Sequence, residues 1–198
     1  MRKGEGEEAD ERALLSGHWF NPERGEHAVK WIERYCKLVE GAWRGHEFRL
    51  LEWQWDLLMR LFGWVRWSKE WERYVRRFRW LYLEVPKKNG KSPMLAAIGA
   101  YLLFGDGCHS ARIYSVATSK KQAQIVHGAV VDMVRESPEL TSVSRIRMQD
   151  GYLVVECPKT GGKWSIAAAD AKTGDGVNGH CLADELHRWT DWEFWNTL

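Results

Sequence analysis

The sequence predicts an α/β protein with a three-layer fold, a mainly parallel sheet and a helical segment in front of it. Segments rich in aromatic and β-branched residues alternate with longer apolar or amphipathic segments along the second half of the chain. Strands that alternate with helices in this way are typical of βαβ units. The 198 residues suffice for one domain with a substantial core, or for a domain and an appendage.

Composition excludes several classes of protein. The 29 Lys and Arg residues nearly balance the 27 Asp and Glu residues, so any affinity for nucleic acid must come from local patches. The polar, acidic start Met1–Glu11 does not resemble a signal peptide, and the longest apolar stretch, Met94–Phe104, is too short to span a membrane. The four Cys residues are widely spaced without a C-x-x-C pair, which argues against a zinc ribbon and favours a reducing cytosol.

The N-terminal part divides into a leader and a helical region. Residues 1–25 are charged and aperiodic, and we expect a flexible leader. Within the region 26–78, apolar residues from His27 onward follow helical spacing until Gly41. A second helix is predicted over Trp53–Phe62, with its end at Gly63.

An aromatic and basic stretch closes this region. Its aromatic residues repeat at intervals of three and four, and basic residues lie between them: Trp64, Trp67, Trp71, Tyr74 and Phe78, with Arg66, Lys69, Arg73, Arg76, Arg77 and Arg79. This spacing favours an amphipathic helix whose Trp stripe packs on the sheet. The alternative interpretation is a surface that binds DNA or a partner through cations and ring faces.

The region 79–198 carries the predicted sheet. Arg79–Val85 has the composition of a buried strand, and the polar turn Pro86–Ser92 leads from it into an apolar helix over Pro93–Phe104. Ala111–Ala117 is predicted to form the next strand. Ser119 and Gln122 then form a capping box, which predicts the start of a helix that reaches about Arg135.

The last third predicts a hairpin and one further strand. Tyr152–Cys157 and Lys163–Ala168 flank a turn that contains Pro and Gly, and the Gly-rich segment Thr173–Gly179 precedes the apolar residues His180–Ala183. A capping box of Thr190 and Glu193 predicts one more helix. Because only a few residues follow, we expect the sheet to be incomplete at its C-terminal end, as in the front portion of a larger enzyme.

The candidate site begins with Gly90, Lys91 and Ser92. A turn between a strand and a helix presents backbone N–H groups and the positive end of the helix dipole to an anion. In such a loop the glycine lets the backbone close on phosphates, the lysine reaches the β- and γ-phosphates, and the serine hydroxyl binds Mg²⁺. The longer pattern has a first glycine where this chain has Val85, and the alternative is an ordinary basic turn.

A second half-site follows the apolar residues of the last predicted strand. Asp184 would hold Mg²⁺, and Glu185 would orient and deprotonate the attacking water. The alternative is a strand end whose acids simply face solvent. His180 and His187 do not fit the H-E-x-x-H zinc pattern, whereas Asp184–His187 also matches a D-E-x-H helicase box.

These segments resemble the large terminase subunit of tailed bacteriophages, the motor that packages DNA into procapsids. The matching segments occur in the order of that family from about residue 28 onward: Leu51–Gln54 with Leu61–Trp64, Val85–Ser92, Ala117–Ala123, and Asp184–Trp189. The resemblance implies a P-loop ATPase of the RecA-like kind with a catalytic glutamate, in which the missing first glycine is common. It also implies that ATP and Mg²⁺ are the cofactors.

The resemblance extends to further residues. Pro86, Lys88 and Asn89 join the nucleotide-binding loop, and Gln54 resembles the glutamine that contacts adenine. The alternative for Gln54 is a surface residue of its helix. Lys87 stands where the family usually has an arginine finger. A lysine keeps the charge but loses the bidentate fork of arginine, so either an arginine of a neighbouring subunit carries more of the work or hydrolysis is slow.

The resemblance also implies partners: double-stranded DNA, a portal protein, a small terminase subunit and further copies in a homo-oligomeric ring. The location would be the host cytoplasm, at procapsids, without a membrane. We expect the separate nuclease domain of the family, and nuclease activity, to be absent from this chain. The alternatives are a fragment of a DExH-type superfamily-2 helicase, and an inactive module that binds DNA or a capsid component.

Overall fold

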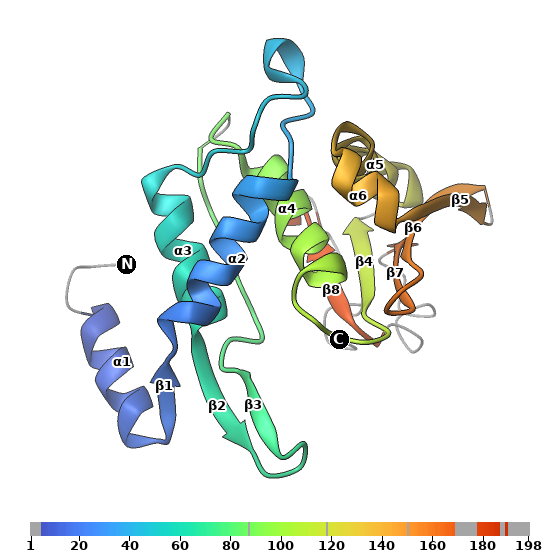
Figure 1. Cartoon of the computed structure of the whole chain (residues 1–198). Coiled ribbons are helices and arrows are strands. Elements are labelled where there is room, and N and C mark those ends of the chain that lie inside the picture. The colour runs from blue at the N-terminus through green and yellow to red at the C-terminus, as the bar shows by residue number, and fades with distance from the viewer. Residues whose placement is uncertain are drawn as a thin grey trace. The chain divides into compact units, whose positions relative to one another are not determined.

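The computed structural model describes residues 5–86, 88–117, 119–149, 151–168, 178–186 and 189. They form two compact units (Figure 1). The N-terminal unit comprises residues 1–30 and 49–85, and the sheet unit comprises residues 31–48 and 86–198. Within the described residues, no helix is long and apolar enough to cross a membrane.

The N-terminal unit combines helices with a small antiparallel sheet. Its strands have the order β1-β2-β3. In chain order the elements are α1 (Glu5–Leu15), β1 (His18–Phe20), the first part of α2 (Pro22–Tyr35), α3 (Glu52–Gly63), β2 (Trp64–Ser68) and β3 (Arg73–Arg76). The predicted helix at Trp53–Phe62 is confirmed. The helix predicted from His27 is also present, but it starts at Pro22 and ends at Tyr35, before Gly41.

The expectation of a loose leader over residues 1–25 is wrong, because α1 and β1 occupy most of it. Asp10 accepts two hydrogen bonds from the Arg60 guanidinium, each 2.8 Å long, and lies 3.5 Å from Arg77. Ala13 is buried. These contacts with distant residues fix a helix that composition alone does not favour, since helices in proteins owe most of their stability to tertiary packing.

The aromatic and basic stretch forms a hairpin, so the predicted amphipathic helix is wrong. Trp67 of β2 lies directly opposite Tyr74 of β3. Between the strands, Glu72 has a φ of 47°, and the backbone N–H of Trp71 is near the Ser68 hydroxyl, at 3.4 Å. Aromatic residues favour strands and cross-strand pairs, and this preference outweighs the helical spacing.

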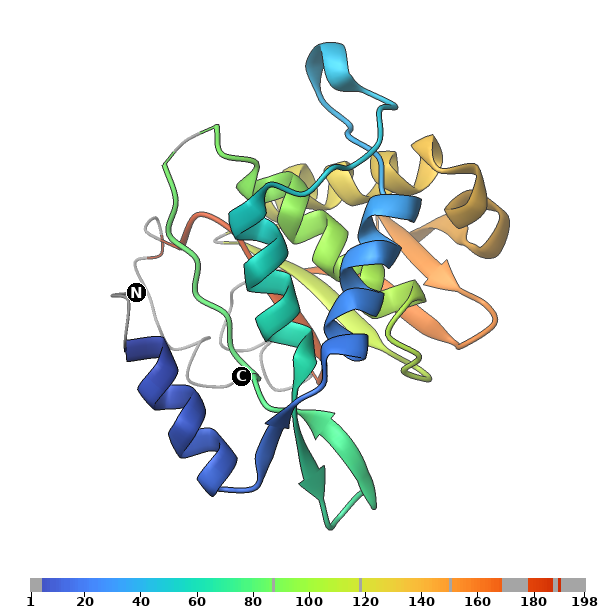
Figure 2. The same cartoon turned by 60° about the vertical axis from the view of Figure 1, so that its left-hand side comes forward.

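Among its described residues, the sheet unit has five strands in the order β5-β6-β7-β4-β8. Figure 2 shows the molecule from a second side. The helices are α4, α5 and α6, with a short 3-10 helix over Gly41–Trp43. Their bounds are α4 (Lys91–Phe104), β4 (Arg112–Ala117), α5 (Lys120–Glu136), α6 (Pro138–Val143), β5 (Arg145–Gln149), β6 (Tyr152–Cys157), β7 (Gly162–Ala168) and β8 (His180–Ala183).

The sheet is mixed rather than mainly parallel. β4 runs parallel to β7 and to β8, whereas β5, β6 and β7 are antiparallel neighbours. The predicted hairpin is confirmed as β6 and β7. Its tight turn, in which Gly161 has a φ of 71°, requires antiparallel pairing.

Strand β5 and helix α6 were not predicted. The predicted helix that begins after Ser119 is confirmed, since the Ser119 hydroxyl accepts from the Gln122 N–H.

Residues 79–85 do not form the predicted strand. Trp80, Leu81 and Tyr82 are exposed. A strand forms only where a partner accepts its backbone hydrogen bonds, and within the described residues no strand pairs with this segment. The composition of residues 79–85 therefore favours a strand, but the segment has no neighbouring strand to pair with among the described residues.

The Gly-rich segment Thr173–Gly179 lies mostly outside the described residues, and the capping box at Thr190 lies wholly outside them.

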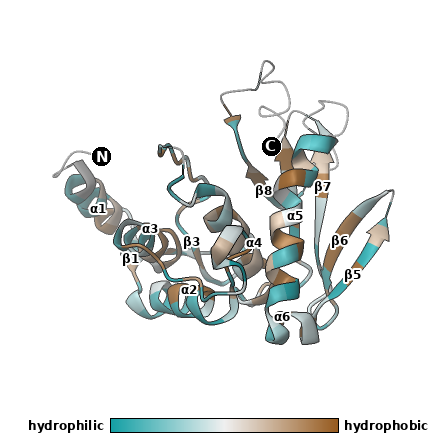
Figure 3. Ribbon diagram, turned by 90° about the horizontal axis from the view of Figure 1, so that it is seen from above, coloured by the Kyte–Doolittle hydropathy of each residue, from teal (hydrophilic) through white to brown (hydrophobic). Residues whose placement is uncertain are grey.

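Helices α4 and α5 cover the same face of the sheet, because they contact each other and both contact β4 and β7. Hydrophobic and hydrophilic residues alternate along α5 (Figure 3), as expected of a helix with one buried face. In α4, Gly99 lies directly on the Trp164 ring of β7 and on Leu182 of β8. A Cβ atom at Gly99 would come within 2.5 Å of Leu182, so only glycine fits this approach.

A buried polar contact joins this layer to the sheet. The Trp164 indole N–H donates to the Ser115 hydroxyl at 3.0 Å, and that hydroxyl lies 3.4 Å from Nδ1 of His127 on α5. His127 is almost completely buried. Burial lowers the pKa of His127 to about 4, against an opposing effect of the Leu153 backbone, so the imidazole stays neutral near neutral pH.

We predict that His127 makes the protein acid-sensitive. The unfolded chain takes up a proton at His127 below its ordinary pKa of 6.5, whereas the folded chain does so only near pH 4. The contribution of neutral His127 to the free energy of unfolding is therefore complete above pH 6.5. It is lost as the pH falls toward 4, by about 3 kcal/mol in total. Urea unfolding over this pH range measures the effect. In His127→Gln, which cannot titrate, this part of the pH dependence should vanish; an unchanged slope would contradict the assignment.

Candidate nucleotide-binding site

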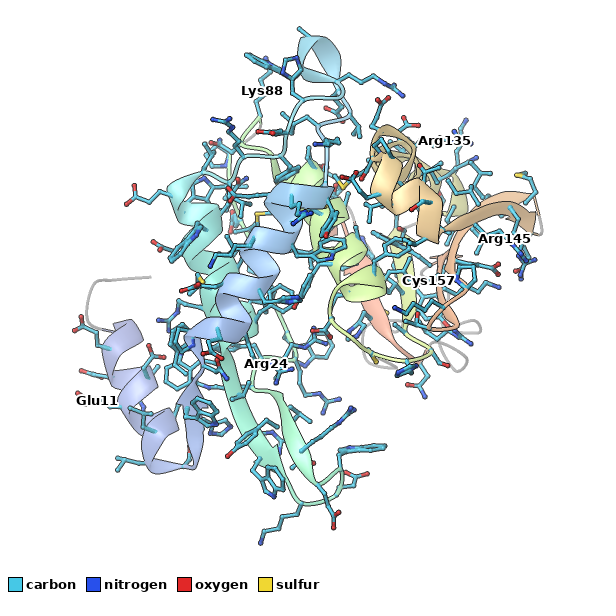
Figure 4. All side chains as sticks on the ribbon, viewed as in Figure 1. Glu11, Arg24, Lys88, Arg135, Arg145 and Cys157 are labelled. Carbon is cyan, nitrogen blue, oxygen red and sulfur yellow. The ribbon has the colours of Figure 1, made fainter. Side chains whose placement is uncertain are left out.

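The loop before α4 places left-handed residues next to a helix N-terminus. Lys88 has a φ of 67° and Gly90 a φ of 73°, and the Asn89 side-chain amide donates to the Pro86 carbonyl at 3.1 Å. Figure 4 labels Lys88 in this loop. The first backbone N–H groups of a helix lack an acceptor within the helix, so those of Lys91 and Ser92 can bind an anion. Pro93, in the same turn, is tolerated because its missing N–H would have no helical partner there.

The carboxyl end of β8 brings two acids to this loop. Lys91 Nζ lies 2.9 Å from Asp184 Oδ1 and 3.4 Å from Glu185 Oε1. The Ser92 hydroxyl donates to Asp184 Oδ2 at 2.9 Å. The two predicted half-sites, 92 residues apart in the chain, thus meet in one place.

Burial and hydrogen bonds set the charges here. Burial alone would raise the pKa of Asp184, but hydrogen bonds from Lys91, Ser92 and the Glu185 N–H outweigh it and lower the pKa below the usual value. The pKa of Lys91 is raised, mainly by its hydrogen bond to Asp184 and against its own partial burial. Asp184 is only 7% exposed and Glu185 is 41% exposed. The site therefore holds a buried carboxylate paired with an ammonium, beside a carboxylate that solvent can reach.

Glu185 has an unusual backbone conformation for a residue other than glycine, with a φ of 53°. Its backbone N–H donates to Asp184 Oδ1 at 2.8 Å. The left-handed conformation turns the chain sharply after β8 and places the two carboxylates on the same lysine. Sequence inspection had no signal for this conformation, although the adjacent acids did mark the position.

The oxygen atoms of this site suit Mg²⁺. Ser92 and Asp184 offer a hydroxyl and a carboxylate oxygen in contact, and Mg²⁺ prefers oxygen ligands together with water and substrate phosphates. Among the described residues, no group of three His, Cys, Asp or Glu side chains lies close enough to hold a metal alone. A metal held by Ser92 and Asp184 would complete its coordination with water and phosphate oxygens.

One further predicted site residue belongs to the other compact unit. Gln54 belongs to α3 of the N-terminal unit; it is 4% exposed, and its side-chain oxygen accepts the Leu51 N–H at 3.0 Å. It is therefore no surface residue, and one of its polar atoms caps its own helix. His180 lies in β8. Lys87 and His187 lie outside the described residues.

A lysine and a serine at a helix N-terminus, joined to two acids at the end of a parallel strand, are typical of α/β proteins that bind nucleoside triphosphates. The model of the family "Terminase large subunit, ATPase domain" matches residues 52–198. The chain belongs to this family.

Similar proteins agree with this membership. The large terminase subunit of Enterobacteria phage HK97 is 28% identical over 157 residues, which cover 78% of this chain and 29% of that protein. The crystal structure of the HK97 large terminase matches with a TM-score of 0.62 and 23% identity, over 83% of this chain and 32% of that one, and supports the mixed α/β fold.

A mutant ATPase domain of the large terminase of Thermus phage P74-26 matches with a TM-score of 0.40 and 19% identity, over 56% of this chain and 49% of that one.

The chain spans about a third or less of the length of the HK97 large terminase.

We predict that the two acids differ in their importance for stability. Asp184→Asn leaves the Lys91 ammonium without its buried partner and should cost about 1–2 kcal/mol of unfolding free energy. Glu185→Gln, at the more exposed position, should change it by less than about 0.5 kcal/mol. Urea unfolding without nucleotide compares the two. Equal losses would contradict the assignment of Asp184 as the principal partner of Lys91.

Proposed function

We propose that this chain binds ATP with Mg²⁺ and hydrolyses it. The observation that supports this most is the convergence of four side chains at the N-terminus of α4, where Lys91 contacts Asp184 and Glu185 and Ser92 donates to Asp184. Membership of the terminase ATPase family agrees with the same chemistry.

The proposed roles follow from the geometry. Lys91 would leave Asp184 for the phosphates, whose negative charge replaces that of the carboxylate. The free N–H groups of the first turn of α4 would bind phosphate oxygens. Ser92 and Asp184 would hold Mg²⁺, which neutralises charge on the transferred phosphoryl group.

Glu185 is the proposed general base. Its carboxylate contacts the same lysine as Asp184 yet remains open to solvent, so a water molecule can reach it. A general base must lie within hydrogen-bond reach of the proton that it removes. The Asp184 carboxylate, buried and bound by Ser92 and Lys91, is less suited to this role and better suited to the metal.

The wider function that we propose is that of a viral DNA-packaging motor. It couples hydrolysis to translocation of double-stranded DNA, in the host cytoplasm, with a portal protein, a small terminase subunit and further copies in a ring. Gln54 is the proposed adenine contact. We also propose that this chain carries no nuclease activity. The family match favours this function over a DExH helicase, which was the first alternative.

We predict that two substitutions separate binding from hydrolysis. Glu185→Gln should retain Mg²⁺–ATP binding and lower the hydrolysis rate by about 10²-fold or more. Lys91→Ala should weaken binding of ATP itself. Phosphate release and titration with a fluorescent ATP analogue measure the two effects.

The matched control is Lys159→Ala, which removes an exposed lysine in the turn between β6 and β7. If wild type and Lys91→Ala are equally inactive yet both bind DNA or a capsid component without nucleotide, the motor function is wrong for this chain and the inactive binding module is favoured.

We also predict an effect at Lys87, where the family usually has arginine. An arginine restores the bidentate fork that stabilises the transferred phosphoryl group. Lys87→Arg should therefore raise kcat, by about tenfold or more, with little change in KM. Lys121→Arg, on the exposed side of α5, is the control for a general effect of lysine replacement. An unchanged or lower kcat in Lys87→Arg would show that Lys87 is no substitute for an arginine finger.

A further inference from the structure

One face of the β2–β3 hairpin carries three arginines that the nucleotide site does not use (Figure 1). The pairing of β3 with β2 continues to Arg77, whose backbone N–H donates to the Trp64 carbonyl at 2.9 Å. In this register the rows that contain Arg77, Arg66 and Arg73 are each two residues apart. Because every second row of an antiparallel pair points to the same side, the three side chains share one face. We call them the arginine face.

The arginine face is basic and open at its outer end. Arg66 and Arg73 are exposed, and the strands β1, β2 and β3 contain no Asp or Glu. The acids of the hairpin, Glu70 and Glu72, lie in its turn. Four residues of extended chain separate Arg73 from the inner end of the row, which gives it a length of about 13 Å. The hairpin thus presents a line of positive charge.

Helix α1 occupies the inner end of the arginine face. Asp10 accepts two hydrogen bonds of 2.8 Å from Arg60 and lies 3.5 Å from Arg77 Nη1. The Ala9 carbonyl accepts from Arg77 Nη2 at 3.3 Å. Arg77 Nη1 is buried and makes no hydrogen bond within the described residues. One carboxylate therefore faces two guanidinium groups, and the charge at this end is only half compensated.

Charge, rather than apolar packing, attaches α1 to its unit. Its 11 residues, EGEEADERALL, include five acids and one arginine. Among the side chains described in α1, only Ala13 is buried, whereas Leu14 and Leu15 are exposed. Ion pairs near the surface are worth little and are screened by salt. Another anion can therefore compete with α1 for the same guanidinium groups.

The arginine face suits the phosphates of a duplex. Guanidinium forks match phosphate oxygens, and a row of cations matches a row of anions. The core of a protein–protein interface is apolar, but on this face Trp64 is buried and Val75 is half-buried. Single strands bind by stacking their bases on aromatic rings, and the exposed rings of these strands, Trp67 and Tyr74, lie on the opposite face.

We propose that the arginine face binds the phosphate backbone of duplex DNA and that α1 is an autoinhibitory cover over its inner end. Asp10 holds Arg60 and Arg77 until phosphates displace it. Bound DNA then compensates both guanidinium groups, and α1 is released from the hairpin. This inference rests on the proposed DNA partner, and it does not depend on ATP hydrolysis.

Fluorescence anisotropy of a short labelled duplex with the full chain, without nucleotide, tests the cover. Asp10→Asn removes the carboxylate that competes with DNA, and we expect binding to become at least about fivefold tighter. The matched control is Glu8→Gln, which makes the same change of charge at an exposed position of the same helix. It should change the affinity by less than about twofold.

The salt dependence of binding tests the arginine face itself. In Arg66→Gln/Arg73→Gln, the slope of log K against log salt concentration should fall in magnitude by about 2, because each phosphate contact releases about one counterion. Both positions are exposed, so the variant should fold, which circular dichroism checks. The control Arg135→Gln/Arg145→Gln removes two exposed arginines of the sheet unit and should leave the slope unchanged.

Hydrogen exchange separates displacement of α1 from a general gain in affinity. With the wild-type chain, the duplex should slow exchange in β2 and β3 and accelerate it in α1. In Arg66→Gln/Arg73→Gln both changes should be lost. Slower exchange of α1 in the presence of DNA would show that the helix is part of the DNA-binding surface, and the autoinhibitory cover would be wrong.

Three further results would overturn the inference: equal effects of Asp10→Asn and Glu8→Gln, an unchanged salt slope in Arg66→Gln/Arg73→Gln, and tighter binding of a single strand than of the duplex. If all variants bind the duplex as the wild type does, the DNA partner stands but binds elsewhere. If no variant binds it, the DNA partner fails as well, whereas ATP binding, measured with Lys91→Ala, still decides the proposed hydrolysis.

Discussion

The contact of Gly99 with Trp164 and Leu182 is the constraint on which the candidate site depends. Gly99 lies two helical turns after Lys91 in α4, and Leu182 lies two residues before Asp184 in β8. One point of close packing therefore fixes both the helix that carries the lysine and the strand that carries the acids. Glycine inside a helix costs about 1 kcal/mol relative to alanine, and the close approach of helix to sheet offsets this cost.

The ion pair between Lys91 and Asp184 follows from this packing. Burying a carboxylate is costly unless charge and hydrogen bonds compensate for it, and here an ammonium, a hydroxyl and a backbone N–H all do so. The groups proposed to bind a phosphate and a metal thus satisfy one another without ligand. In the proposed function, binding of nucleotide would exchange one set of charge pairs for another and so keep the buried charge compensated.

The sequence was most informative where local chemistry decides the structure. The Ser119 cap, the β6–β7 hairpin, and the strand end before Asp184 all depend on residues within a few positions of each other, and each was predicted. The predictions of secondary structure failed where contacts with residues far away in the sequence determine whether an element forms. Asp10 holds α1 through Arg60, and residues 79–85 lack a strand partner among the described residues; neither fact has a local signature. The aromatic stretch failed for a third reason, because intervals of three and four fit a helix while cross-strand pairing of Trp67 with Tyr74 satisfies the same residues.

The conformation of Glu185 gives Asp184 a second role. A left-handed backbone costs about 1–2 kcal/mol for a residue with a side chain, and the hydrogen bond from the Glu185 N–H to Asp184 Oδ1 is the interaction that offsets it. Asp184 therefore holds the proposed base in position and is also the proposed metal ligand. A neutral side chain at position 184 would weaken both functions at once, whereas the loss of Ser92 would remove one proposed metal ligand and one hydrogen bond to Asp184 but leave the bond from the Glu185 N–H in place. The ratio of the effects of these two substitutions on hydrolysis, at saturating Mg²⁺, thus measures how much catalysis depends on the position of Glu185.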